Sequence, residues 1–276
     1  MRVIVTGGRG FLGGHVCDTL RAGGHEAIAL GRLDGDLAEP GVAARLLDEH
    51  RPQAVVHLAA VMPDDARLGQ NAPMTALVAQ ACAERGVRLL HGSTTSVYGD
   101  ETPYADSKRA SEEAARDATI LRFAFPYGPG QRRGAIPTML KQARAREPIV
   151  VYRGWERSFC FAGDAARAVV LLLERRGAWD LGRNDDPRTL EEVARLACRV
   201  SGAPESLIEL VEPPAGPAPV LEKLDVEPLR ALGWEPVLEL DLGLPAERAQ
   251  RLGWEPEVEL EDGLRRTLDW LLSPPA

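Results

Sequence analysis

Two hydrophobic periodicities alternate along the first half of the chain. Short apolar runs, typical of strands buried on both faces, are separated by longer segments in which apolar residues recur at helical spacing. The apolar runs predict strands at Val3–Val5, Ala27–Leu30, Ala54–Leu58, Arg88–His91 and Thr119–Arg122. The helical pattern covers residues near 12–22, 40–50, 70–85 and 104–117. Such alternation predicts an α/β fold with a doubly wound parallel sheet, right-handed crossovers and helices on both faces.

The pattern becomes less regular after Phe125, where Pro126–Gly130 forms a cluster of turn residues. Further elements are predicted as a helix near 135–146, a strand at Ile149–Tyr152, a helix at Asp164–Arg175 and a strand at Ala178–Leu181. The helix after Asp164 is expected to return to the main sheet. Glu212–Pro217 is predicted to be a loop within a smaller, mostly C-terminal domain.

The C-terminal part contains an internal repeat, because Leu232–Pro236 recurs as Leu252–Pro256. The similarity continues, since Leu240, Gly243 and Leu244 recur as Leu260, Gly263 and Leu264. Two copies do not make a solenoid. We expect a local duplication with a packing role, in which Trp234 and Trp254 anchor a core, while a ligand-binding role is the alternative.

A glycine-rich turn between the first strand and the first helix is the most informative local motif. Gly7 permits a tight turn, Gly10 lets backbone N–H groups approach a pyrophosphate, and Gly13 lets the helix pack closely on the sheet. Phosphates then lie at the positive end of the helix. The alternative is a flexible loop with incidental glycines, but the flanking strand and helix favour dinucleotide binding on a Rossmann-type sheet.

Composition narrows the class of partner. The chain has 276 residues, of which 45% are hydrophobic, so we expect a sizeable folded core. The net charge of −8 argues against a nucleic acid or an acidic membrane as its main partner. The four cysteines are far apart and form no Cys-x-x-Cys pair, so we expect core residues in a reducing compartment and no metal site. No secretory or membrane-spanning segment is evident, which predicts a cytoplasmic protein.

Tyr104 and Lys108 are spaced to share one face of a helix. An ammonium beside a phenol lowers the pKa of the phenol, and a tyrosine tuned in this way can move a proton to or from a substrate oxygen. The alternative is a solvated helix face. Ser93–Ser96 follows the fourth strand and offers hydroxyls at the same edge of the sheet, although we expect Thr95 and Ser96 to cap the backbone of their own loop.

In this order, the motifs resemble those of the extended short-chain dehydrogenase/reductase family, often called the NAD-dependent epimerase/dehydratases. The resemblance covers most of the chain. The motifs that carry it are Thr6–Gly13, Gly35–Leu37, His57–Ala60, Asn71, Ser93–Gly99, Tyr104-x-x-x-Lys108, Leu121–Arg122, Tyr127–Pro129, Arg157–Phe159 before Asp164, and the late Leu-Gly-Trp-x-Pro.

The resemblance implies a catalytic triad of Thr94, Tyr104 and Lys108, with Lys108 also holding the nicotinamide ribose. It implies a cofactor groove to which Tyr104 and Lys108 also belong, together with Gly7, Arg9, Gly10, Phe11, Leu12, Gly13, Arg32, Asp36, Leu37, Leu58, Ala59 and Ala60. Candidates for substrate contact are Thr95, Tyr127 and Arg157; the last resembles an arginine that contacts a nucleotide-sugar phosphate, and its alternative is an ordinary surface arginine. The implied domains are a dinucleotide-binding domain of residues 1–125 and 158–185 and a substrate domain of residues 126–157 and 186–276.

The end of the second strand predicts the cofactor. An NAD enzyme of this type usually carries an acidic residue there, whereas this chain continues from Leu30 into Gly31 and Arg32. A guanidinium can pair with a 2′-phosphate, and Arg9 points to the same region in similar proteins. Asp34 falls too late for the usual acidic position. The sequence therefore predicts NADP(H), without excluding NAD(H).

NADP(H) favours net redox chemistry, such as reduction of a keto-sugar carried on a nucleotide. The alternatives are an NAD(P)-dependent nucleotide-sugar epimerase that oxidises its substrate transiently, and a regulator that binds NADP without catalysis. Thr95–Ser96 stands where 4,6-dehydratases carry Asp-Glu, which argues against dehydration. The short segments Ala60–Asn71 and Asp100–Pro103 predict an open substrate site. The helix after Tyr104 is short for the family's usual homodimer contact.

Overall fold

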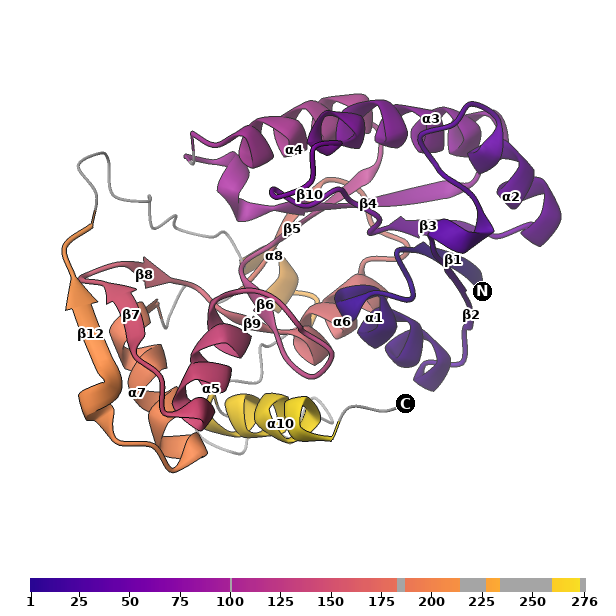
Figure 1. Ribbon diagram of the computed structural model, residues 1–276. Helices are drawn as coiled ribbons and strands as arrows, with labels where there is room; N and C mark the ends of the chain where they lie inside the picture. The colour runs from indigo at the N-terminus through magenta and orange to yellow at the C-terminus, as the bar shows by residue number, and fades with distance from the viewer. Residues whose placement is uncertain (100, 183–186, 214–226, 234–259, 274–276) are drawn as a thin grey trace.

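A six-stranded parallel sheet forms the centre of the computed structural model, which describes residues 1–99, 101–182, 187–213, 227–233 and 260–273 (Figure 1). The strand order is β10-β5-β4-β3-β1-β2, and every neighbouring pair is parallel. The strands are β1 (Arg2–Thr6), β2 (Glu26–Leu30), β3 (Ala54–His57), β4 (Arg88–Thr94), β5 (Thr119–Phe123) and β10 (Ala178–Leu181). The predicted Rossmann-type doubly wound sheet is confirmed.

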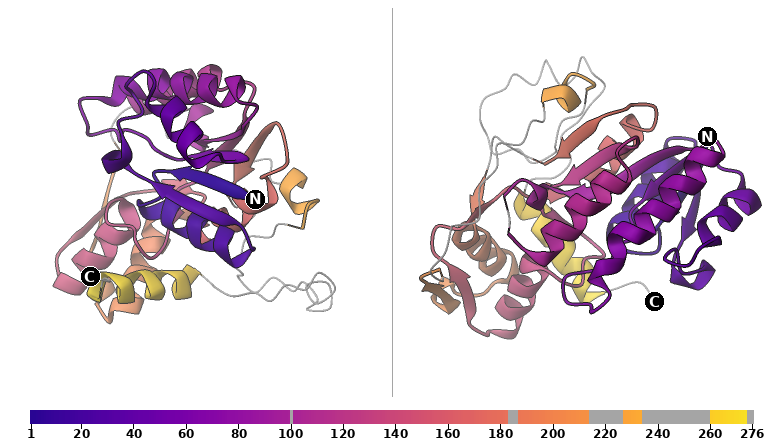
Figure 2. Two further views of the ribbon diagram at one scale, coloured as in Figure 1. Left: turned by 90° about the vertical axis from the view of Figure 1, so that its right-hand side faces the viewer. Right: turned by 90° about the horizontal axis from the view of Figure 1, so that it is seen from above.

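Helices cover both faces of this sheet (Figures 1 and 2). One face carries α1 (Phe11–Ala22) and α6 (Ala162–Leu171); the other carries α2 (Val42–His50), α3 (Asn71–Glu84) and α4 (Pro103–Ala114). Successive strand residues point to opposite faces. Val3 and Val5 therefore join the core beneath α1 and α6, whereas Ile4 joins the core beneath α2 and α3.

A second apolar core lies beside the sheet and is built mainly by three helices. These are α5 (Ala135–Ala145), α7 (Leu190–Ser201) and α10 (Leu260–Leu272), which pack with the parallel pair β7 (Ile149–Tyr152) and β12 (Ile208–Val211). The remaining short elements are β6 (Pro126–Tyr127), β8 (Glu156–Arg157), β9 (Cys160–Phe161), β11 (Arg188–Thr189), α8 (Glu227–Arg230) and four 3₁₀ turns, η1 (Arg32–Asp34), η2 (Leu68–Gln70), η3 (Thr95–Val97) and η4 (Glu205–Leu207).

The predicted elements are found, and three of their ends differ from the prediction by three residues or more. The fourth strand continues to Thr94, so Ser93 and Thr94 belong to the strand instead of following it. The helix predicted to reach residue 117 ends at Ala114, and the helix predicted over Asp164–Arg175 spans Ala162–Leu171. Hydrogen bonds and packing fix these ends, whereas apolar spacing carries little information about them.

The repeated segments are only partly described. Trp234 and Trp254 lie outside the described residues, as does most of the Pro-rich loop after Pro213. Leu260 and Leu264 are buried in the second core. A packing role is therefore visible for this part of the second copy.

All four cysteines are free and buried, as expected of core residues. Among the described helices, none is long and apolar enough to cross a bilayer. The part of the chain that the structure describes contains no cluster of three potential metal ligands.

Candidate active site

The glycine turn joins β1 to α1, and its geometry requires glycine at three positions. A Cβ on Gly8 would lie 2.6 Å from the carbonyl oxygen of Val5. Gly7 has φ +68°, and a Cβ there would lie 2.9 Å from the backbone N of Ala59. A Cβ on Gly13 would approach the carbonyl oxygen of Gly7 to 2.2 Å. Gly10 precedes the helix in an extended conformation and supplies no side-chain cap. The first N–H groups of α1 thus resemble the donors that bind a diphosphate at a helix start.

The end of β3 lies directly against this turn. Thr6 accepts the backbone N–H of Leu58 through its carbonyl oxygen at 3.1 Å and that of Ala59 through Oγ1 at 3.3 Å. The predicted groove residues Leu58 and Ala59, which follow β3, are therefore adjacent to the start of the glycine turn after β1. Ala60 is the next residue in the chain. Of the first two helical residues, Leu12 packs into the core and Phe11 stacks edge-on with His15.

The end of β2 carries a contact that sequence reasoning missed. Arg9 forms an ion pair with Asp34 at 2.9 Å, and the same carboxylate accepts the backbone N–H of Gly31 at 2.7 Å. The Gly31 hydrogen bond and Arg9 hold the pKa of Asp34 below its usual value. Arg32 is exposed at the start of η1. The signal available in the sequence was the presence of an acid within one turn of Gly31.

Asp36 and Leu37, two of the predicted groove residues, lie just beyond this turn. Asp36 uses Oδ1 to accept the backbone N–H of Ala38 at 3.0 Å, so its carboxylate stabilises the local turn. Leu37 packs against the core beneath α2.

Tyr104 and Lys108 lie on one face of α4, as their spacing predicts. Lys108 is 3% exposed, and its Nζ donates to the carbonyl oxygen of Gly92 on β4 at 2.6 Å. Burial lowers the pKa of Lys108 to about 8, against an opposing effect of Glu112. Burial raises the pKa of Tyr104.

The expectation that Lys108 lowers the pKa of Tyr104 is therefore wrong for this state of the protein. The lysine is turned toward β4, and desolvation of the phenol dominates its titration. Desolvation disfavours the charged form of either group, so it moves the two pKa values in opposite directions, the lysine downward and the tyrosine upward.

Thr94 ends β4 and caps the short turn η3. Its Oγ1 accepts the backbone N–H of Ser96 at 3.3 Å, a capping role that we had expected of Thr95 and Ser96 themselves. Thr95 is 6% exposed. Because α4 packs on both η3 and β4, the three predicted catalytic residues lie on adjoining elements.

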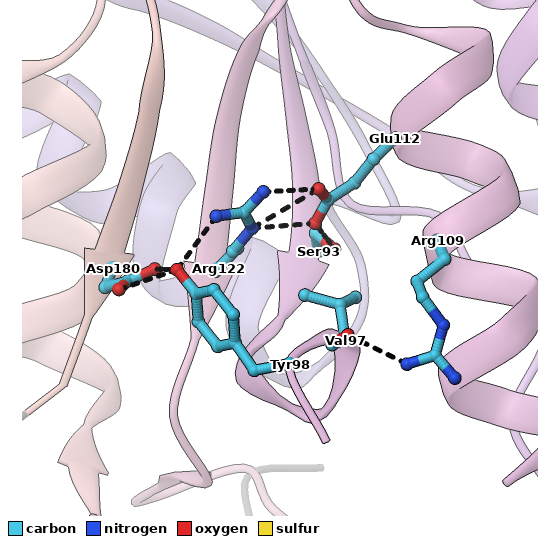
Figure 3. Close-up of polar contacts among 7 residues, drawn as sticks. All are labelled: Ser93, Val97, Tyr98, Arg109, Glu112, Arg122 and Asp180. Atoms are coloured by element: carbon cyan, nitrogen blue, oxygen red, sulfur yellow. Dashed lines mark hydrogen bonds and ion pairs between the residues drawn. The ribbon is translucent and has the colours of Figure 1, made fainter. Parts of the chain in front are cut away.

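A polar network fixes the far end of η3 (Figure 3). The Tyr98 hydroxyl donates to Asp180 on β10 at 2.6 Å and accepts from Arg122 on β5 at 2.8 Å. Arg122 also pairs with Glu112 on α4 at 2.7 Å, and Glu112 accepts the hydroxyl of Ser93 at 2.5 Å. The network ties η3 to three strands and to the helix that carries Tyr104.

Arg109 holds η3 from the other side (Figure 3). Its guanidinium donates to the carbonyl oxygen of Val97 at 2.8 Å. One helix therefore presents Tyr104 and Lys108 and also contacts the turn that follows Thr94. No local spacing pairs Glu112 with Arg122 or Ser93, so the sequence analysis did not identify this network.

Two buried histidines lie beneath α3 and α4. His57 and His91 are paired across β3 and β4, with ring centroids 5.5 Å apart. His57 contacts Thr6 at 2.7 Å and Thr75 at 3.4 Å. Burial and then the charge of Lys108 lower the pKa of His57 to about 3 and that of His91 well below its usual value. Both imidazoles are therefore neutral at physiological pH.

The candidate substrate residues have different environments. The guanidinium of Arg157 lies over the rings of Phe125 and Trp155, at 5.1 and 5.5 Å from their centroids. Tyr127 is 1% exposed and packs edge-on with Phe159 in the second core. Its position favours a packing role over substrate contact.

The profile of the NAD-dependent epimerase/dehydratase family matches residues 3–182, which include the glycine turn, the Thr94 turn, α4 and the sheet. The chain belongs to this family. Its members use nicotinamide cofactors, and the residues around the glycine turn fit such a group. A Cβ on Gly10, just before α1, would meet only the carbonyl oxygen of Gly7 within 4 Å, and the Lys108 ammonium lies against β4, two residues before Thr94 ends that strand.

Relatives within the family differ in the reactions that they catalyse. The chain is 29% identical to a UDP-glucose 4-epimerase of Azospirillum brasilense over 88% of its length and 94% of that protein. It is 30% identical to a dTDP-4-keto-6-deoxy-D-glucose reductase of Streptomyces niveus, over 73% of this chain and 79% of that protein. Relatives at nearly equal identity therefore include both an epimerase and a reductase.

The fold agrees with that of a solved UDP-glucose 4-epimerase from Thermus thermophilus in complex with NAD. The two chains superpose with a TM-score of 0.79 over 100% of each and are 24% identical. This likeness supports the assignment of the fold.

Proposed function

We propose that this family member is an NADP(H)-dependent oxidoreductase that reduces a carbonyl carbon of a keto-sugar carried on a nucleotide. The observation that carries the proposal is the placement of Tyr104 and Lys108 on α4, against the β4 strand that ends in Thr94. The glycine turn, Arg9 and Arg32 would bind the dinucleotide, and the likeness to the Streptomyces niveus reductase supports this substrate class.

The bound cofactor would supply the hydride, and the protein would handle the proton. The raised pKa of Tyr104 keeps its phenol protonated at neutral pH, which is the state required of a general acid. Tyr104 would donate that proton to the carbonyl oxygen, and Thr94 would hydrogen-bond the same oxygen. Lys108 has a pKa of about 8, so it remains mostly cationic at pH 7 and would hold the nicotinamide ribose.

The smaller domain would bind the nucleotide. Arg157 lies over two aromatic rings, an arrangement that combines a positive charge for phosphate with apolar surface nearby. We place the substrate diphosphate at Arg157 and the keto group at Thr94 and Tyr104.

The test is whether the protein reduces any member of a panel of nucleotide-linked keto-sugars. The reaction is monitored through the loss of absorbance of the reduced nicotinamide. Tyr104→Phe should lower the turnover by about 10²–10⁴-fold, the range for removal of a general acid. The Kd for NADPH should change by less than about tenfold, because the variant removes a single hydroxyl and a typical hydrogen bond contributes about 1 kcal/mol. Undiminished turnover would remove Tyr104 from the mechanism.

The epimerase alternative has support in the Azospirillum brasilense relative. Native mass spectrometry of freshly purified protein distinguishes the two reactions. A stoichiometric retained NAD with interconversion of sugar epimers would establish the epimerase. NADPH binding without reduction or epimerisation of any panel member would instead identify a regulator.

A further inference from the structure

Phe125 combines a rare backbone conformation with an exposed aromatic ring. Its φ is +32°, a value that bulky residues seldom adopt, and it precedes Pro126, which favours extended backbone in the residue before it. Within the described part of the chain, the other non-glycine residues with positive φ are Arg51 and Arg146, and each ends a helix. Left-handed backbone is common at helix ends, so of these three residues Phe125 alone lacks a local reason for it.

The ring of Phe125 lies at the sheet edge that carries the candidate active site. β4 and β5 pair in parallel with Thr94 opposite Phe123, so Phe125 follows the same carboxyl edge as Thr94. Its carbonyl oxygen accepts the backbone N–H of Cys160 at 3.5 Å, and its ring meets that of Phe159 edge-on, with centroids 6.1 Å apart. The ring therefore packs against the second core, yet the residue is still 40% exposed.

The same ring contacts the arginine at which we place the diphosphate. The guanidinium carbon of Arg157 lies 5.1 Å from the centroid of Phe125. A sugar that joins a diphosphate at Arg157 to a keto group at Thr94 has to extend past Phe125, because Phe125 contacts the former residue and follows the strand edge of the latter. An aromatic ring offers such a sugar a flat apolar face for its C–H groups.

We propose that Phe125 is a substrate-contacting residue, which binds the apolar C–H face of the sugar ring and contributes to the choice of substrate. The inference rests on the proposed function and extends its substrate site. Strained backbone clusters at ligand-contact sites, where the surrounding structure enforces it. A ring without hydrogen-bonding groups at this point favours sugars that present C–H or methyl groups to it over sugars that present a charge.

The affinity that the sugar adds to the nucleotide measures this contact. Titration calorimetry of the full chain with NADPH present gives the Kd of UDP and of UDP-glucose, and neither is a ketone that could be reduced; dTDP and dTDP-glucose form a second pair. We expect the ratio Kd(UDP)/Kd(UDP-glucose), or its dTDP counterpart, to fall by about threefold to tenfold in Phe125→Leu. This variant keeps an apolar side chain but removes the aromatic face.

Tyr152→Leu is the matched control. It removes a ring of similar exposure, 36%, which stacks on Trp155 with centroids 4.5 Å apart. Trp155 lies under the same guanidinium as Phe125, so the control also tests an indirect effect through Arg157. We expect Tyr152→Leu to leave the ratio unchanged.

Phe125→Gly separates strain from packing. Glycine adopts positive φ readily, so this variant should unfold at a temperature no lower than that of Phe125→Leu, while its ratio falls at least as far. A lower unfolding temperature for the glycine variant would show that the ring is retained for packing, and it would overturn the inference.

Two further outcomes also count against Phe125. A wild-type ratio near one, or an equal loss of affinity for nucleotide and nucleotide sugar in Phe125→Leu, would remove the sugar contact and leave the proposed function in place. A wild type that binds neither nucleotide pair would overturn the proposed function as well. If the ratio falls as expected but no keto-sugar is reduced, the inference stands and only the proposed reaction fails.

Discussion

His91 shows how a single side chain can oppose the stability of this sheet. It is 1% exposed, and neither ring nitrogen has a hydrogen-bond partner among the described residues. A buried polar group without a partner is destabilising relative to an apolar one. Nothing in the proposed mechanism requires an imidazole at this position.

We therefore predict that His91→Leu increases the free energy of unfolding, and more so in acid. The pKa of His91 lies well below the ordinary value because of burial and then the charge of Lys108. Below about pH 6.5, His91 binds a proton in the unfolded chain but stays neutral in the native state. The free energy of unfolding of the wild type therefore falls as the pH falls through that value. The advantage of the variant should grow by about 2 kcal/mol between pH 7.5 and pH 5. Urea unfolding at both values measures it, and an advantage independent of pH would contradict the assignment.

For single residues, the sequence was enough to name the triad candidates, but it did not give the direction in which the pKa of Tyr104 shifts. The spacing of Tyr104 and Lys108 gave their common helix face. The direction of the tyrosine pKa depended on where the lysine nitrogen points, and the carbonyl of Gly92, sixteen residues before Lys108, decides that. Asp34 falls too late in the sequence for the usual acidic position after the second strand. The turn η1 nevertheless brings its carboxylate to the backbone of Gly31 and to Arg9.

Among the elements, η3 is held by side chains from four neighbours, and Tyr98 makes two of these contacts. Its hydroxyl bonds both Asp180, which is 5% exposed, and Arg122. Burial and then Asp180 raise the pKa of Tyr98 to about 12, so the phenol remains a donor at any pH at which the protein would be used.

We predict that Tyr98→Phe lowers the free energy of unfolding by about 1–3 kcal/mol, because a largely buried carboxylate loses a donor. Tyr152→Phe is the matched control, since Tyr152 is 36% exposed and makes no hydroxyl hydrogen bond among the described residues; it should change stability by less than about 0.5 kcal/mol. Equal effects of the two variants in urea unfolding would show that the network contributes nothing.

The same network explains why element prediction succeeded while the arrangement around the site did not follow from it. Apolar spacing identified β4, β5, β10 and α4. The partners Ser93, Glu112, Arg122 and Asp180 are separated by up to 87 residues in the sequence, and no local pattern pairs them. Their alignment follows from strand register, in which Arg122 lies opposite both Ser93 and Asp180.

At the scale of the whole molecule, α10 returns the end of the described chain to the second core. It passes close to Tyr127 at Gly263, where a Cβ would lie 2.7 Å from the hydroxyl oxygen and 2.9 Å from a ring carbon of Tyr127. Tyr127 is itself fully enclosed. The helix can occupy this position only because residue 263 has no side chain.

We predict that Gly263→Ala destabilises the protein by about 1–3 kcal/mol through overpacking. The matched substitution is Gly14→Ala in α1, where a Cβ would meet nothing within 4 Å. It should stabilise the protein by up to about 1 kcal/mol, the helix-propensity difference between alanine and glycine. Thermal unfolding of both variants checks the opposite signs, and destabilisation by both to the same degree would contradict the packing argument.

The sequence by itself determined the parallel sheet, the glycine turn, the helix face shared by Tyr104 and Lys108, and the family. They could be predicted from short segments of sequence, because strand and helix periods, tight turns, i,i+4 pairs and family motifs involve residues that are close together in the chain. The tertiary structure alone decided the Arg9–Asp34 pair, the orientation of Lys108, the clamp on η3 and the enclosure of Tyr127. Each depends on groups that the chain brings together only after folding, and on a loss of water that no spacing records.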